Sequence, residues 1–173
     1  MKTTSCRTAL FNYFGSKFSL ALCFELFYGV EKMNKLVKDK NMSWVIPYLI
    51  VADAGIAAQY YADHFGFEIL SLAKGDDGKT FHAELRYKDI VIMCGSTDFC
   101  GETIKTPAAG NFKSPVTLYV YHENVDALYN TLTAQGVKVD AAPENQFWGD
   151  RMLRLTDSDG HQWSFATKVA EHA

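Results

Sequence analysis

The sequence predicts an α+β protein built from two tandem βαβββ modules. Two observations carry this prediction: short apolar runs with strand periodicity flank two amphipathic helical segments, and the order strand, helix, three strands occurs twice. One such half leaves a face of its sheet uncovered, so the two halves are expected to share a core. We therefore expect a cupped mixed β-sheet with the helices on its outer face and a concave face open to a ligand.

The first module is predicted at about residues 43–97. Its first strand carries Pro47, which is typical of a strand edge or a strand start. A helix follows, with Asp53 as its N-cap and Gly66 as its C-terminal stop. Three more strands are predicted, the first two joined by a hairpin turn, over 67–74, 80–87 and 90–95.

The second module is predicted at about residues 114–168. It repeats the first, with a helix that ends at Gly136 between strands over 115–121 and 137–143. The loop between the modules, 95–115, is rich in Gly, Pro and Thr and is expected to fold over a site as a lid.

The last hairpin of the second module is closed by a turn over 157–160. Its Asp-x-Asp-Gly pattern is a common hairpin signal. We therefore interpret Asp157, Asp159 and His161 as residues of a tight turn and not as a metal cluster.

Composition indicates an ordinary globular protein. Of its 173 residues, 48% are hydrophobic and 21% are charged, which suits one domain, placed here at 42–170. A net charge of −3 without a cluster of Lys and Arg argues against a nucleic-acid partner. The four cysteines show no Cys-x-x-Cys spacing, so we expect free thiols and a cytoplasmic location.

Residues 1–41 differ from the rest and are interpreted as an N-terminal extension. Two alternatives stay open: the segment is disordered or loosely docked, or translation starts later, at Met33 or Met42. Its apolar stretch, 18–30, contains Glu25 and is shorter than the roughly 20 residues that span a membrane, so no membrane partner is expected.

Three polar residues share one face of the strand predicted at 80–87. His82, Glu84 and Arg86 alternate with apolar residues, so they point away from the helix if the apolar set packs on it. There they would hold an anionic or hydrogen-bonding ligand, with His82 or Glu84 as candidate acid or base. The alternative is a solvated network of charges on an exposed sheet face.

Several segments, quoted together, resemble one superfamily. They are "PYLIVAD", "FHAELRYKDIVIM", "LYVYHENVDALY" and "FWGDR" followed by "DSDGHQWSFAT". Over about residues 43–167 they resemble the vicinal oxygen chelate superfamily of glyoxalases, ring-cleaving dioxygenases, and bleomycin- and fosfomycin-resistance proteins. "FWGDR" is most similar to the PhnB-like branch. The resemblance implies a small-molecule site in the cup and a homodimer.

Metal-dependent members of that superfamily place one ligand on the first strand and one on the last strand of each module. Carried over to this chain, the four positions are Ile46, Met93, Thr117 and Ser164. None offers the imidazole or carboxylate that a divalent cation prefers at such a site. We therefore expect no metal and no other cofactor.

Aromatic residues are predicted to line the cavity. Tyr48, Tyr119 and Tyr121 alternate on the first strands of the modules, and such a cavity suits a flat, partly polar ligand; ordinary core packing is the alternative. Trp148, Asp150 and Arg151 form either a cavity rim oriented by an ion pair or a tight turn in which Asp150 binds nearby backbone. We favour the latter for Asp150 and leave Trp148 open.

The resulting hypothesis is a metal-independent small-molecule-binding protein of the glyoxalase/bleomycin-resistance type, which acts by sequestration. The expected ligand-binding residues are Tyr48, His82, Glu84, Arg86, Met93, Thr117, Tyr119, Tyr121, Trp148 and Ser164. The alternative is a metal-dependent lyase, isomerase or dioxygenase-like enzyme with a relocated metal site. A pure interaction domain, its cup filled by the protein's own side chains or by the N-terminal segment, is a third hypothesis.

Overall fold

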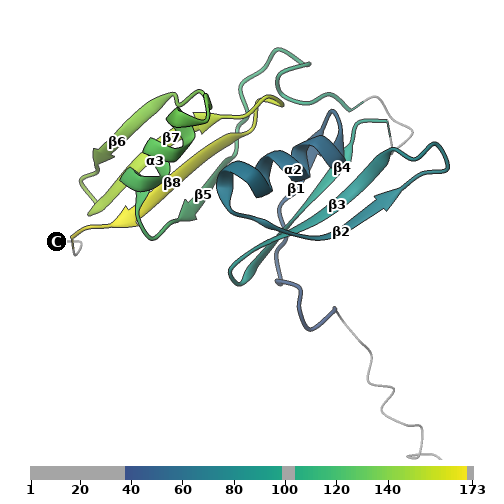
Figure 1. Cartoon of the computed structure of the whole chain (residues 1–173), viewed down its shortest axis with the longest axis horizontal. Helices are drawn as coiled ribbons and strands as arrows, with labels where there is room; N and C mark the ends of the chain where they lie inside the picture. Colours follow the sequence, from purple (N-terminus) through teal and green to yellow (C-terminus); the bar gives the residue numbers. More distant parts are fainter. Residues whose placement is uncertain (1–37, 99–103, 171–173) are drawn as a thin grey trace, which may run out of the picture. The chain divides into compact units, whose positions relative to one another are not determined.

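The computed structural model describes residues 38–98 and 104–170, so nearly all of the N-terminal extension and Cys100 lie outside the described residues (Figure 1). The strands and helices of the described residues all belong to the compact unit Asn41–Ala173. In the described part of the chain, no helix is long and apolar enough to cross a membrane.

The first module has the predicted order of elements. It consists of β1 (Tyr48–Val51), α2 (Ala54–Phe65), β2 (Glu68–Lys74), β3 (Thr80–Tyr87) and β4 (Ile90–Ser96). The sheet order is β1-β4-β3-β2, with β1 parallel to β4 and the other pairs antiparallel. The side chain of Asp53 accepts from the backbone N–H of Gly55 and Ile56, and Gly66 adopts φ 76°, so both predicted ends of α2 are confirmed.

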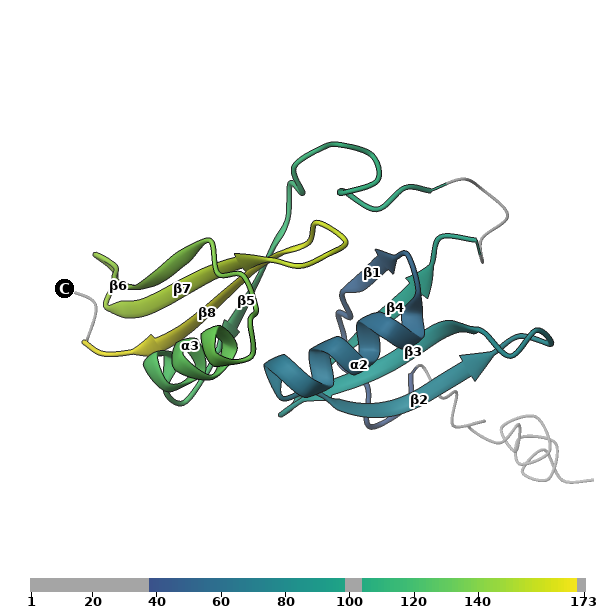
Figure 2. The ribbon, with the colours of Figure 1, turned by 45° about the horizontal axis from the view of Figure 1, so that its top comes forward.

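The second module repeats this topology. It consists of β5 (Thr117–Tyr121), α3 (Val125–Ala134), β6 (Ala141–Asn145), β7 (Asp150–Thr156) and β8 (Gln162–Lys168), in the sheet order β5-β8-β7-β6. Figure 2 shows α2 against the sheet of β1 to β4 and α3 against the sheet of β5 to β8. The predicted α+β fold of two βαβββ modules is confirmed, with one four-stranded mixed sheet in each module.

One predicted strand was misplaced. The pairing strand is Ala141–Asn145, whereas the prediction was 137–143. Val137 and Val139 are β-branched, but they pack against the hydrophobic core instead of pairing with β7. Pro143 lies within β6, the edge strand of its sheet, where the ladder to β7 has a register shift.

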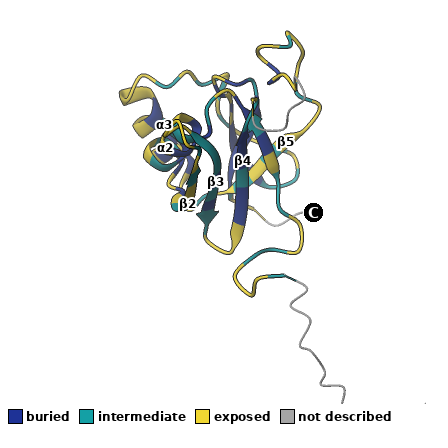
Figure 3. Cartoon of the chain, turned by 90° about the vertical axis from the view of Figure 1, so that its right-hand side faces the viewer, coloured by how far each residue is buried: buried dark blue, intermediate teal, exposed yellow. Residues whose placement is uncertain are grey.

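The two modules share one hydrophobic core, as expected. Tyr61 and Phe65 of α2 contact Trp163 of β8, with ring centroids 5.0 and 5.1 Å apart, and Phe65 also lies 5.0 Å from Phe165. Figure 3 shows buried residues along much of β4. Ala83 and Leu85 of β3 belong to this core, so the helix-facing side of that strand is the predicted one.

The turn Asp157–Gly160 is a joint between the modules as well as a hairpin turn. Asp157 accepts from Tyr61 Oη at 2.7 Å and from Trp163 Nε1 at 2.9 Å. Asp159 accepts from the backbone N–H of Ala52 at 2.9 Å, and His161 Nε2–H donates to the carbonyl of Ile50 at 2.8 Å. All three side chains predicted as turn residues thus have structural partners.

The loop between the modules is held on this turn. The backbone N–H of Ala108 donates to the carbonyl of Asp159 at 2.9 Å. Gly160, at φ 88°, permits this contact, because a Cβ there would lie 2.6 Å from the Ala108 nitrogen. The described part of the loop is therefore anchored at the module joint, and the expected lid stays a prediction.

Candidate functional site

The first module brings together three of the predicted residues on the face of its sheet that points away from α2. His82 Nδ1 lies 3.2 Å from Tyr48 Oη, and His82 Nε2 lies 3.7 Å from Glu84 Oε1. The side chains of His82 and Glu84 are 20% and 23% exposed, so both are sheltered yet reachable by a ligand. We call Tyr48, His82 and Glu84 the His82 cluster.

A glycine allows the tyrosine to reach the histidine. His82 pairs with Gly95 across β3 and β4, while Tyr48 and Glu84 both pair with Met93. A Cβ on Gly95 would lie 2.6 Å from Tyr48 Oη, so any larger residue there would displace the phenol. Met93 lies on β4 between Tyr48 and Glu84, and forms the half-buried floor of the cluster.

Arg86 does not join this cluster. Its Nη1 lies 3.9 Å from Glu68 Oε2 on β2, and the two side chains are 36% and 68% exposed. A pair at this distance and exposure contributes little, because solvent and salt screen it. The predicted trio of His82, Glu84 and Arg86 thus divides into a sheltered pair and a surface ion pair.

The second module is organised around a buried carboxylate. Asp150 is 1% exposed, and its Oδ2 accepts from Tyr119 Oη at 2.7 Å, Tyr121 Oη at 3.0 Å and Trp148 Nε1 at 3.1 Å. The predicted bond of its side chain to nearby backbone is wrong, because the side chain binds three side chains instead. We call Tyr119, Tyr121, Trp148 and Asp150 the Asp150 cluster.

The phenols span a whole strand to reach this carboxylate. The sheet order is β5-β8-β7, with the tyrosines on β5 and Asp150 on β7. The residues of β8 in register with Tyr119 and Tyr121 are Ser164 and Ala166. Both are small, and Ser164 is 3% exposed, so the intervening strand leaves room for two rings to lean across it.

The charge of Asp150 is balanced unevenly. Hydrogen bonds from Tyr119, Tyr121 and Trp148 lower the pKa of its carboxyl, and they all reach Oδ2. Oδ1 has no hydrogen-bond partner, and Lys168 Nζ lies 3.6 Å from it. Burial, followed by the hydrogen bond to Asp150, raises the pKa of Tyr119 to about 12. The pKa of Tyr121 is raised mainly by its own hydrogen bond to Asp150.

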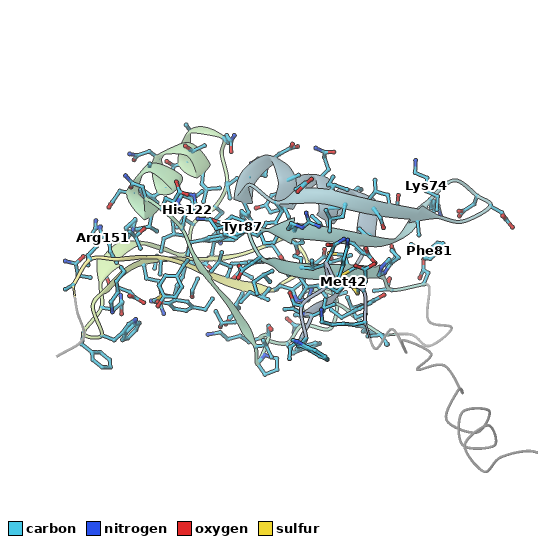
Figure 4. The ribbon with its side chains drawn as sticks, turned by 90° about the horizontal axis from the view of Figure 1, so that it is seen from below. Met42, Lys74, Phe81, Tyr87, His122 and Arg151 are labelled. Atoms are coloured by element: carbon cyan, nitrogen blue, oxygen red, sulfur yellow. The ribbon has the colours of Figure 1, made fainter. Side chains whose placement is uncertain are left out.

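Arg151 belongs to a different contact. Its Nε and Nη2 donate to the two carboxylate oxygens of Asp126 on α3, both at 2.8 Å. This fork, with Arg151 labelled in Figure 4, joins β7 to α3. The ion pair considered between Asp150 and Arg151 is therefore absent from this site; Lys168 is the cation beside Asp150.

A groove runs along β5. Its volume is about 650 Å³, within the range of small-molecule sites. The second module contributes Thr117 to Tyr121, and the first contributes Pro47, Tyr87, Ile90 and Ile92. Three predicted ligand-binding residues, Thr117, Tyr119 and Tyr121, thus line one groove.

The positions that hold metal in related sites do not fit a metal here. In the observed register Tyr48 pairs with Met93 and Tyr119 pairs with Ser164, while Thr117 pairs with Gln162 and Ile46 precedes β1. Neither the four positions expected from the sequence nor the pairs in the observed register supply an imidazole or a carboxylate. Across residues 38–98 and 104–170, no three His, Cys, Asp or Glu side chains are grouped so as to hold a metal ion.

Most of the predicted residues therefore fall into two clusters, one on each sheet, while Arg86 and Thr117 belong to neither. Sequence reasoning missed Asp150 as the centre of the second cluster and Lys168 as its counter-charge. The available signal was the pair of tyrosines on one face of a strand, because two neighbouring phenols can share one acceptor, as Tyr119 and Tyr121 do. Nothing in the sequence pairs a residue on β5 with one two strands away.

The sequence matches the model of the Glyoxalase/Bleomycin resistance protein/Dioxygenase superfamily over residues 42–165. An uncharacterized protein of Mycobacterium bovis is 35% identical over 127 residues, which cover 72% of this chain and 83% of that protein. An uncharacterized protein of Mycobacterium tuberculosis is equally identical, and 74% of its length is covered.

Solved structures share the fold. TioX from Micromonospora sp. ML1 has a TM-score of 0.59 at 22% identity, over 73% of this chain and 99% of TioX. A bleomycin resistance determinant encoded on the transposon Tn5 has a TM-score of 0.54 at 20% identity, over 73% and 98%. A bleomycin-binding protein complexed with bleomycin has a TM-score of 0.53 at 20% identity, over the same shares. With these matches, the chain belongs to the glyoxalase/bleomycin resistance protein/dioxygenase superfamily.

Proposed function

We propose that this protein is a metal-independent binding protein of the glyoxalase/bleomycin-resistance type that sequesters a small organic molecule. The observation that carries the proposal is the replacement of metal ligands by a hydrogen-bonded aromatic cluster. At the paired positions of the second module stand Tyr119 and Ser164, and the tyrosine is committed to Asp150. A site of this kind encloses a ligand but offers no Lewis acid to activate it.

The groove along β5 supports binding of a partly apolar molecule. Apolar and aromatic residues line most of it, and a few polar atoms from Thr117, Tyr119 and Tyr121 provide orientation. A solved structure with this fold, named for its complex with bleomycin, favours the same class of function. We also propose the PhnB-like branch, on the resemblance of the Trp148 to Arg151 stretch, which supplies Trp148 and Asp150 to the second cluster.

A rival candidate is an enzyme that uses the His82 cluster. His82 lies between a phenol and a carboxylate, a geometry that suits a general base or one half of a relocated metal site. Metal content measured by mass spectrometry, on protein purified without a metal-affinity tag, separates the two. We expect no stoichiometric metal in the wild type. One equivalent of zinc, nickel, manganese or iron that disappears in His82→Ala would overturn the binding proposal.

Ligand binding is then tested directly. A thermal-shift screen of flat aromatic compounds should yield ligands that raise the midpoint of unfolding without turnover. Binding should persist after treatment with a chelator. A ligand that binds only in the presence of added divalent metal would contradict the proposal.

We also propose a homodimer. Two exposed apolar residues along the groove, Val45 and Val116, are 81% and 64% exposed. Large apolar side chains at such exposure favour a protein partner, and a second copy is the commonest one. Light scattering after size exclusion should give twice the chain mass. Val116→Glu should shift the mass toward the monomer, whereas Val169→Glu, at another exposed apolar position, should not.

A further inference from the structure

Resting on the binding function proposed above, we infer that the Asp150 cluster is a recognition subsite for a flat ligand that carries a protonated nitrogen group, such as an amine or amidine. Three features of the cluster lead to this class of ligand. They are the direction of its hydrogen bonds, its unbalanced charge, and the exposed faces of its rings.

The first feature is that the hydrogen-bond donors of the cluster are already engaged with Asp150. The phenols of Tyr119 and Tyr121 and the indole N–H of Trp148 all donate to the same oxygen, Asp150 Oδ2. The indole N–H also lies 3.3 Å from Tyr119 Oη. A phenol that donates inward presents lone pairs outward, so a ligand meets acceptors and must supply the donors itself.

The second feature is an incompletely compensated carboxylate. Asp150 Oδ1 is buried without a hydrogen-bond partner, and its nearest cation, Lys168 Nζ, stands 3.6 Å away. The side chain of Lys168 is 45% exposed, and its ammonium donates to the carbonyl of Trp148 at 3.0 Å. A buried charge of this kind favours a second positive group nearby, and the partly exposed lysine can give way to it.

The third feature is the arrangement of the two tyrosine rings that a ligand would meet. Tyr119 and Tyr121 are 42% and 57% exposed and are among the residues along the groove of β5, whereas Trp148, Asp150 and Lys168 are not. Their rings lie 5.6 Å apart at 67°, which offers one face and one edge to a flat group. A cation above a tyrosine face gains a further attraction from the ring.

An anionic ligand would find a better place elsewhere on the same sheet. A separate pocket of about 200 Å³ at the other end of β8 contains two cations, Lys113 and Arg154, and one carboxylate, Asp140. That end therefore has an excess of positive charge. The cation-accepting end is the one that contains the two tyrosines.

The test uses three small probes of nearly equal shape: benzamidine, which is cationic, benzamide, which is neutral, and benzoate, which is anionic. Binding to the full chain is measured by ligand-observed NMR titration. We expect benzamidine to bind at least about tenfold more tightly than either analogue, the size of one charge-assisted contact. Equal affinity for all three, or a preference for benzoate, would overturn the subsite.

Variants then assign the preference to the cluster. Asp150→Asn should abolish the preference for benzamidine, while Asp63→Asn, which removes a carboxylate on α2, should leave it unchanged. Because Asp150 is buried, its variant is first checked for folding by circular dichroism. Tyr121→Phe, at a more exposed position, keeps the ring and should weaken benzamidine several-fold.

Lys168→Met provides a test of opposite sign. If the lysine competes with the ligand's cation, its removal should tighten benzamidine binding several-fold. A purely structural role for Lys168 predicts weaker binding or no change, and either result would count against the inference. The thermal-shift screen stays independent: aromatic ligands that bind without preference for charge would leave the proposed function standing and remove only this subsite.

Discussion

At the scale of single residues, the second cluster depends on one carboxylate. Its sequence context suggested that Asp150 would bond to nearby backbone. Instead it accepts hydrogen bonds from three side chains, two on β5 and one in the preceding turn. The bonds favour its ionised form, which is why its pKa is lowered. Its contribution to stability is therefore present above the ordinary carboxyl pKa and is lost as the pH falls through the lowered value.

The titration of Tyr119 tests this arrangement. Its pKa is raised from 10.0 to about 12, first by burial and then by its bond to Asp150. The neutral phenol is the form that the fold favours, so its stabilising effect is complete below pH 10.0 and disappears as the pH rises through about 12. NMR of labelled tyrosine rings should show this late ionisation, and Asp150→Asn should move it to lower pH.

Tyr119→Phe assigns the NMR signal of the Tyr119 ring, because the signal with the late titration should be missing from the spectrum of this variant. Tyr129→Phe, on α3, is the matched control and should leave it in place. A Tyr119 that ionises at the ordinary pKa of a solvated phenol would show that the bond to Asp150 is not maintained in solution.

Gly95 has a comparable influence on the first cluster. A methyl group there would lie 2.6 Å from Tyr48 Oη and 2.7 Å from a ring carbon. Gly95→Ala should therefore displace Tyr48 from His82 and cost about 1–3 kcal/mol of unfolding free energy, as overpacking commonly does. Chemical denaturation measures the cost. The cost should fall sharply in a Tyr48→Ala background, and an unchanged cost there would show that the strain lies elsewhere.

At the scale of elements, the outcome of sequence reasoning follows the range of the interactions involved. The ends of α2 were predictable, because Asp53 and Gly66 act on backbone within a few residues. The position of β6 was not, because Val137 and Val139 have strand propensity but are used for core packing. The faces of β3 were predictable from alternation, whereas the partners of Asp150 depend on strand order, which no local pattern encodes.

The turn Asp157–Gly160 shows the same limit. Its Asp-x-Asp-Gly pattern predicts a hairpin turn, and the backbone N–H groups of Asp159 and His161 do donate to Asp157 Oδ1. The pattern does not disclose that Asp157 Oδ2 also accepts from Tyr61 and Trp163 in the shared core. One oxygen of Asp157 thus stabilises the turn, while the other accepts hydrogen bonds from residues far away in the sequence.

Asp157→Ala should be strongly destabilising for that reason. It leaves the hydroxyl of Tyr61 and the indole N–H of Trp163 buried without an acceptor, at about 1–3 kcal/mol for each unsatisfied group. We expect a total loss of roughly 2–5 kcal/mol in denaturant unfolding. Ser158→Ala, at an exposed position of the same turn, is the control and should stay within about 0.5 kcal/mol. Similar costs for both variants would reduce Asp157 to an ordinary turn residue.

At the scale of the whole molecule, neither module is a complete folding unit. The ring stack of Tyr61, Phe65, Trp163 and Phe165 combines α2 of the first module with β8 of the second. Separated, each module would expose half of this stack to water. The groove along β5, which takes residues from both modules, depends on the same association.

The modules should therefore unfold in one cooperative transition. Fluorescence of Trp163, measured in a variant in which Trp44 and Trp148 are replaced by Phe, reports on the joint, and far-ultraviolet circular dichroism reports on both modules, so the two denaturation curves should coincide. Phe65→Ala, which removes a ring that is 1% exposed, should lower the unfolding free energy by about 3–5 kcal/mol. Because the core is shared, both curves should shift together in the variant. Two separate transitions, or a fluorescence change that precedes the loss of circular dichroism, would mean that each module folds alone and that the groove forms only by docking.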